Sequence, residues 1–249
     1  MKLLVLFTAV SLFMLSGCAS TPGGRDVDRT SAADANAELG LRYMLQGDLE
    51  VAMEKLERAL EFDSRHVPAH HYTAELYRRL DRDDRASRHF ALAVRHSREP
   101  DYALFNNYGA FLCSQGEYDK GEEQFLKVLE NPVYSRPDQV YENLGLCMES
   151  KGDLDKAQSY LRQGLNLNAR APRSLLAMAR INFEQENHLS TRAYLQRFRE
   201  VARHTPESLW LGIRTERILG DRNALGSYSL SLQRNFPDAE ETRLYLESR

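Results

Sequence analysis

A small residue recurs along this chain at steps of 33 to 36 residues, and this period constrains the fold more than any other feature. The positions that share it are Gly40, Ala74, Gly109, Gly145, Ala179 and Gly212. A second series follows each of them by seven or eight residues, at Gly47, Asp81, Gly116, Gly152, Asn187 and Gly220. Proline keeps the same period, at Pro68, Pro100, Pro137, Pro172, Pro206 and Pro237. Three series in one phase indicate that the chain is a stack of similar structural units.

A period of about 34 residues is typical of the tetratricopeptide repeat, in which two helices are joined by a turn. In this interpretation the small residue lies in the first helix of each pair, helix A, and lets the second helix, helix B, approach closely. Apolar residues four apart, such as Ala157 and Leu161, lie on one face of helix B. A glycine after the small residue suits the end of helix A, because it adopts left-handed backbone angles without strain.

We therefore predict an all-α fold, a right-handed superhelical solenoid of about six tetratricopeptide helix pairs with a C-terminal capping helix. The solenoid covers residues 33–249, with repeats at 33–66, 67–100, 102–135, 138–171, 172–205 and 206–239. Residues 240–249 form the cap, because a terminal repeat needs a polar outer face. Pro132 and Pro137 predict a defined loop between the third and fourth repeats.

The N-terminus differs in kind from the rest of the chain. Lys2 precedes an apolar run from residue 3 to residue 15, which is shorter than the roughly 20 residues that a membrane-spanning helix needs. This is the pattern of a secretory signal peptide, and residues 15–18 (LSGC) resemble a bacterial lipobox. The alternative is a plain signal peptide with an incidental cysteine. We expect a lipoprotein signal peptide at 1–17, lipidation of Cys18, and a flexible tether of small and polar residues at 18–32.

Charge and motifs argue against nucleic-acid binding and catalysis. With 33 basic and 36 acidic residues the formal net charge is −3, so nucleic acid is not an expected partner. Histidines cluster at His66, His70 and His71, but Pro68 interrupts the spacing that a metal site on one regular helix would need. No zincin, serine-hydrolase or phosphate-loop motif occurs. We therefore expect no metal, no cofactor, no small-molecule substrate and no enzymatic activity.

Cys113 and Cys147 are one repeat apart, near the ends of successive A helices. Such helices are neighbours in this fold, at interaxial distances of about 8–10 Å. The oxidising compartment that an exported protein enters favours a disulfide between the two cysteines. The open alternative is a pair of buried free thiols, because a bridge forms only if the two side chains face each other.

The A helices line the concave side of such a solenoid, and extended concave surfaces are what repeat proteins use for binding. We select candidate partner-binding residues by their position on this face. They are Asn106, Asn107, Glu142, Asn143, Arg173 and Arg180. Asparagine offers both donors and an acceptor to an extended peptide backbone. The alternative for each residue is that it caps a helix or faces water.

Two stretches of the third and fourth repeats carry a more specific resemblance: NNYGAFLCSQGEYDKGEEQF at 106–125 and NPVYSRPDQVYENLGLCM at 131–148. Together with the lipobox and the six repeats, they resemble the PilF/PilW lipoproteins of type IV pilus biogenesis. The resemblance implies a pilotin, which binds the secretin PilQ and promotes its localisation and multimerisation. Ala19 is not the aspartate that retains such lipoproteins at the inner membrane. The resemblance therefore also implies a lipid anchor in the outer membrane, with the solenoid facing the periplasm.

Two alternatives remain open. Another tetratricopeptide lipoprotein, serving β-barrel assembly or regulating a cell-wall synthase, would have the same fold and a different partner. A periplasmic enzyme acting on peptidoglycan would need a cleft with a convergent set of acid, base or metal groups, and the sequence offers no such set.

Overall fold

The computed structural model describes residues 23–248, with side chains from Asp28 onward. The predicted signal peptide at 1–17 and the lipidation site Cys18 lie outside the described residues. Within residues 23–248 the regular structure consists of thirteen α-helices and no strand, which confirms the predicted all-α class. No helix in that range is long and apolar enough to cross a membrane.

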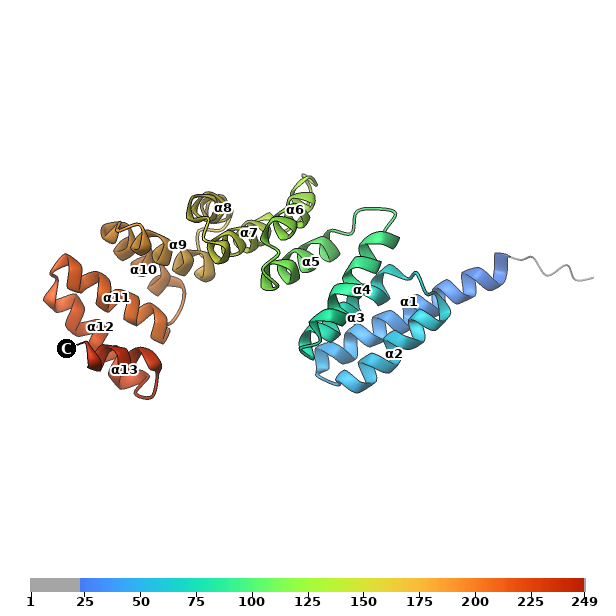
Figure 1. The fold of residues 1–249 in the computed structure, drawn as a ribbon, viewed down its shortest axis with the longest axis horizontal. Helices are drawn as coiled ribbons and strands as arrows, with labels where there is room; N and C mark the ends of the chain where they lie inside the picture. Colours follow the sequence, from blue (N-terminus) through green and yellow to red (C-terminus); the bar gives the residue numbers. More distant parts are fainter. Residues whose placement is uncertain (1–22, 249) are drawn as a thin grey trace, which may run out of the picture. The chain divides into compact units, whose positions relative to one another are not determined.

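The helices fall into two compact units, divided in the sequence between His96 and Ser97 (Figure 1). The first unit holds two helix pairs, α1 (Gly23–Gln46) with α2 (Leu49–Phe62) and α3 (Val67–Arg79) with α4 (Asp83–His96). The second unit holds four pairs: α5 (Tyr102–Ser114) with α6 (Tyr118–Leu129), α7 (Pro137–Lys151) with α8 (Leu154–Leu167), α9 (Pro172–Glu184) with α10 (His188–Val201), and α11 (Pro206–Leu219) with α12 (Arg222–Asn235). The last helix, α13 (Glu240–Glu247), packs on α11 and α12 as the predicted cap.

The periodic small residues lie where helices A and B of a pair come closest. A Cβ atom added to Gly109 would lie 3.0 Å from the ring of Phe125, closer than side chains normally approach. Gly145 stands against Leu161 in the same way, with too little space for a Cβ atom. The predicted close approach is therefore confirmed at both positions, and these glycines set the distance between the paired helices.

Left-handed backbone angles mark the turn after helix A. The four glycines at this turn have φ angles from 76° to 91°, as predicted for Gly47, Gly116, Gly152 and Gly220. Asp81 takes the same conformation in the second repeat, with φ of 55°. In the fifth repeat the predicted position, Asn187, is wrong by one residue, because the left-handed residue is Glu186, with φ of 60°. Glu186 keeps the seven-residue step from Ala179 that the first four repeats show.

The predicted flexible tether at 18–32 is wrong over residues 23–32, because α1 already begins at Gly23. Arg29 explains part of this extension. Its Nε donates to the carbonyl oxygen of Phe62 at 3.2 Å, and its Nη2 donates to that of Glu61 at 3.3 Å. These carbonyls end α2 and have no partner within their own helix. A cation is also favourable at a helix C-terminus, so Arg29 holds the early turns of α1 against α2.

The four pairs of the second unit share a packed interior. A cluster of buried side chains extends from Phe125 on α6 to Leu211 on α11, and a second cluster joins α11 to α13. The stacked repeats therefore give their A helices a rigid support.

Candidate functional site: the A helices of the second unit

We call the helices α5, α7, α9 and α11 the A layer, in which each helix contacts the next. All six candidate partner-binding residues lie on this layer. Asn106 and Asn107 are on α5, Glu142 and Asn143 on α7, and Arg173 and Arg180 on α9. The structure thus places the six residues on three successive helices, and their contacts decide what each one can do.

An amide contact joins the first two helices of the A layer. The Nδ2 of Asn143 donates to the Oδ1 of Asn106 at 3.1 Å, and the Nδ2 of Asn106 donates to the Oδ1 of Asn107 at 3.4 Å. All three side chains are half-buried. Each amide has two donors and two lone pairs, so these contacts do not use its full hydrogen-bonding capacity. The three asparagines therefore connect two repeats and still present polar groups at the surface.

Glu142 caps the next A helix from outside. Its Oε2 accepts hydrogen bonds from the backbone nitrogen of Ser174 at 3.2 Å and from the Ser174 hydroxyl at 2.7 Å. Its Oε1 pairs with Arg173 at 3.1 Å. Ser174 lies in the first turn of α9, where backbone N–H groups have no partner in the helix, and Ala171 at the N-cap has no side chain that could accept. Glu142 therefore replaces the missing cap and holds α7 to α9.

Arg180 joins three helices of the A layer. Its Nε and Nη2 donate to the two carboxylate oxygens of Glu149 on α7 at 2.8 and 2.7 Å, and its Nη1 donates to Glu207 on α11 at 2.8 Å. The hydrogen bonds to Glu149 raise the pKa of Arg180 above its usual range, against the opposing effect of burial. Arg180 is therefore a cross-link between repeats. Arg173 is the most exposed of the charged candidates, since 65% of its side chain is exposed, against 14% for Glu142.

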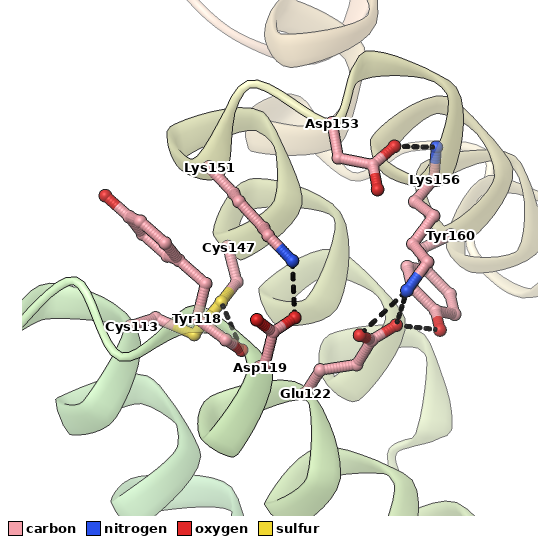
Figure 2. A network of polar contacts seen from close by, with 9 residues as sticks. All are labelled: Cys113, Tyr118, Asp119, Glu122, Cys147, Lys151, Asp153, Lys156 and Tyr160. Carbon is pink, nitrogen blue, oxygen red and sulfur yellow. Dashed lines mark hydrogen bonds and ion pairs between the residues drawn. A yellow bond between two sulfur atoms is a disulfide. The ribbon is translucent and has the colours of Figure 1, made fainter.

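A disulfide connects two helices of the A layer. Figure 2 shows the bond between Cys113 near the end of α5 and Cys147 on α7, whose Cα atoms are 5.5 Å apart. The sulfur of Cys147 also lies 3.8 Å from the carbonyl oxygen of Tyr118, a contact without a hydrogen bond because a bridged sulfur carries no proton. Gly121 on α6 leaves room for the bridge, since a Cβ atom there would collide with the sulfur of Cys113. The bridge therefore ties the A helices of the third and fourth repeats.

A set of polar contacts beside the disulfide ties α6 to the following pair (Figure 2). Glu122, which is only 9% exposed, accepts a hydrogen bond from the Tyr160 hydroxyl at 2.7 Å and two from Lys156 at 3.0 Å. Asp119 pairs with Lys151 in the same region. Burial, followed by the hydrogen bond to Glu122, raises the pKa of Tyr160 above its usual range. These partners hold the repeats together and leave neither Glu122 nor Asp119 as an unpaired carboxylate.

The histidines of the first unit form a cluster in which His66, His70 and His71 are buried and His89 is half-buried. The Nδ1 atoms of His70 and His89 are 3.0 Å apart, and the Nε2 of His70 lies 3.1 Å from the carbonyl oxygen of Ser64. The Nε2 of His66 lies 2.8 Å from a carboxylate oxygen of Asp34. Within residues 23–248, no group of three or more His, Cys, Asp or Glu side chains is arranged to hold a metal ion. The cluster is a network of packed and hydrogen-bonded rings.

Comparison with known proteins identifies the family. The model of the tetratricopeptide repeat matches residues 138–170, which is the fourth repeat. The type IV pilus assembly protein PilF of Pseudomonas aeruginosa is 31% identical over 242 residues, which cover 96% of this chain and 94% of PilF. The chain belongs to the PilF family. The resemblance predicted from the third and fourth repeats and the N-terminus is thereby confirmed.

Solved structures of the PilF family agree with this assignment. The structure from a functional characterisation of Pseudomonas aeruginosa PilF has a TM-score of 0.78 and 29% identity, and the match covers 89% of this chain and 100% of PilF. The crystal structure of PilW, described as a widely conserved type IV pilus biogenesis factor, has a TM-score of 0.79 and 27% identity over 86% of this chain and 98% of PilW. An uncharacterized protein of Haemophilus influenzae is 30% identical over 152 residues, covering 61% of this chain and 83% of that protein.

Sequence reasoning missed several residues that shape the A layer of this PilF-family chain. Glu149 and Glu207 fix Arg180, and Ser174 receives the cap from Glu142. For the two glutamates the sequence offered a signal, because Glu149 and Glu207 lie 31 and 27 residues from Arg180, close to one repeat, and carry the opposite charge. Opposite charges near that spacing on successive A helices predict contacts between repeats.

Proposed function

We propose that this PilF-family protein is a non-enzymatic pilotin that binds the secretin PilQ of the type IV pilus and promotes its multimerisation in the outer membrane. The observation that carries the proposal is the similarity to a type IV pilus assembly protein over 96% of this chain and 94% of PilF. Because the similarity includes all six repeats, the same surfaces are available for the same kind of partner.

The anchor in this proposal is Cys18. The lipobox directs the attachment of lipids to this cysteine. Several acyl chains hold a protein at a membrane far more firmly than one. Ala19 permits transport to the outer membrane in this class of lipoprotein, so the solenoid faces the periplasm at the membrane where a secretin must assemble.

In this proposal the A layer is the surface that binds the secretin. Its helices are held by a disulfide, by Glu142 and by Arg180, so the surface is formed before a partner arrives. Secretin subunits bound to anchored copies are concentrated at one membrane, and a higher effective concentration favours their assembly without any chemical step. Arg173, the most exposed charged candidate, contacts the partner most readily, together with the polar edges of Asn106, Asn107 and Asn143.

Deletion of the gene tests the proposal. We expect the secretin to remain monomeric in an immunoblot of unheated membranes, and surface pili to be lost. A plasmid copy of the wild-type gene should restore the multimer, whereas Cys18→Ser should restore it poorly at an equal protein level. Normal secretin multimers in the deletion strain would contradict the proposal.

Single variants of the A layer separate binding from folding. Arg173→Ala should weaken binding of the secretin while leaving the melting temperature unchanged, because the lost surface ion pair contributes about 0–1 kcal/mol. Arg180→Ala is the matched comparison: it should lower the melting temperature, because it removes the contacts of Arg180 to both Glu149 and Glu207.

A further inference from the structure

A cavity in the A layer has polar groups that the contacts described above leave unused. Its volume is about 430 Å³, and it lies between α9 and α11 beside the start of α10. The residues that line it are Arg180, Phe183, Glu184, Glu186, His188, Leu211, Arg214 and Ile218. Arg180 is already paired with Glu149 and Glu207. Arg214 and His188 are therefore the side chains of this lining that could bind a ligand.

Two buried atoms of this lining have no hydrogen-bond partner. They are the Nε of Arg214 and the Nδ1 of His188, and no other buried side-chain nitrogen or oxygen in residues 28–248 shares this state. A buried donor without an acceptor costs free energy, and native structures rarely keep one without a reason. Arg214 and His188 both line this cavity, although the two orphaned atoms themselves are shielded from solvent. The terminal nitrogens of Arg214 are therefore the donors that a ligand with hydrogen-bond acceptors would engage.

Arg214 is held in position by aromatic rings. Its guanidinium carbon lies 4.4 Å from the centroid of the Phe183 ring and 5.7 Å from that of Trp210. No ion pair reaches Arg214 within the described part of the chain, whereas Arg180 nearby has two. Stacking on a ring engages the face of a guanidinium and leaves the N–H groups at its edge available. The donor is therefore oriented before a ligand binds.

The remaining lining is apolar within and acidic at the rim. Phe183 and Ile218 supply the apolar wall, with the core residue Leu211 behind them at 1% exposure. Ile218 is 56% exposed, which is high for a large apolar side chain. Glu184 and Glu186 are exposed, and Glu186 holds the left-handed φ angle of 60° that a residue with a side chain rarely adopts. That conformation belongs to the turn after α9, so the turn places the Glu186 carboxylate at the rim of the cavity.

The charge of the cavity lining decides whether a charged or a neutral hydrogen-bond acceptor fits. The lining carries two arginines and two glutamates, and Arg180 is already neutralised by two further carboxylates. A ligand carboxylate would therefore enter a surrounding with excess negative charge. A backbone carbonyl oxygen is a neutral acceptor for Arg214, and a basic side chain beside it would meet the two glutamates.

We propose that this cavity binds a segment of a partner protein in which an apolar side chain is followed by a basic one. The apolar side chain packs against Phe183 and Ile218. A backbone carbonyl of the segment accepts a hydrogen bond from Arg214, and the basic side chain pairs with Glu184 or Glu186. The site goes beyond the proposed function, since it does not require the secretin to be the source of the segment.

Trp210 reports on this site, because it is the single tryptophan of the chain and contacts Arg214. Capped peptides are titrated into the full-length protein in detergent while Trp210 emission is followed. The probes are acetyl-GGLKGG-amide, the same peptide with Glu in place of Lys, and the same peptide with Ser in place of Leu. We expect a saturable change with GGLKGG, about fivefold weaker binding of GGLEGG, and no saturable change with GGSKGG.

Matched variants assign the binding to the cavity. Arg214→Met should weaken GGLKGG binding about tenfold, and Arg217→Met, which alters an exposed arginine on the same helix, should leave it unchanged. Ile218→Ser and Glu184→Gln test the apolar wall and the rim separately, so the result does not depend on how Arg214→Met folds. Ile218→Ser should weaken the binding of GGLKGG. Glu184→Gln should reduce the difference in affinity between GGLKGG and GGLEGG.

Several results would overturn this inference. They are the lack of saturation with GGLKGG, equal binding of GGSKGG, tighter binding of GGLEGG, or unchanged binding by a well-folded Arg214→Met variant. None of these results bears on the pilotin proposal, which is tested by deletion of the gene.

Discussion

At the residue scale, the glycines between paired helices have the clearest predicted effect on stability. Gly145 faces Leu161 with too little space for a Cβ atom, whereas Gly226 on α12 is exposed and has nothing within 4 Å of that position. Gly145→Ala should therefore destabilise the protein by about 1–3 kcal/mol through overpacking. Gly226→Ala should stabilise it by up to about 1 kcal/mol, because alanine has the higher helix propensity. Urea unfolding measures both changes, and equal effects of the two substitutions would show that the A–B contact is misassigned.

The paired rings of His70 and His89 predict a pH dependence of stability. Burial first, and then the charge of His70, lower the pKa of His89 from 6.5 to about 4, and burial also lowers the pKa of His70. The unfolded chain therefore binds these protons more readily than the folded one. The contribution of the two neutral histidines to the free energy of unfolding should be fully present above pH 6.5. It should be lost as the pH falls toward about 4. His89→Gln should flatten the fall in melting temperature over this range, and an unchanged slope would contradict the assignment.

At the scale of helices and repeats, stability depends on connections between successive pairs. The Cys113–Cys147 bridge closes a segment of 34 residues between α5 and α7. Its removal by the double substitution to serine should cost about 2–4 kcal/mol of unfolding free energy. Reduction of the wild-type protein is the matched control and should give the same loss. If thiol labelling of the denatured, unreduced protein found two reactive cysteines in the soluble domain, the bridge would not be present in solution.

The elements that the sequence predicted well are those set by local rules. Gly109 and Gly145 could be recognised from their period, and Gly152 from the left-handed end of helix A. The cap that Glu142 places on α9, and the contacts of Arg29 that lengthen α1, depend on which helices become neighbours in space. Their residue types alone are compatible with solvated surface positions, so these contacts could be identified only from the folded chain.

At the scale of the whole molecule, a binding surface made of helical repeats is combined with a proposed lipid anchor that localises it to a membrane. In the proposed function the repeats supply partner contacts, and a lipid on Cys18 determines where they act. Neither part needs a catalytic group, and each can be changed without the other. The central claim is that the position of this protein determines where the secretin assembles.

One substitution tests that claim directly. Aspartate after the lipidated cysteine retains bacterial lipoproteins at the inner membrane, so under the proposed function Ala19→Asp should move the protein there while leaving residues 23–248 unchanged. Inner and outer membranes of cells that carry only this variant are separated, and each is immunoblotted for secretin multimers. We predict that the multimers move with the protein to the inner membrane. Multimers that stay in the outer membrane at their normal level, while the variant is at the inner membrane, would contradict the claim.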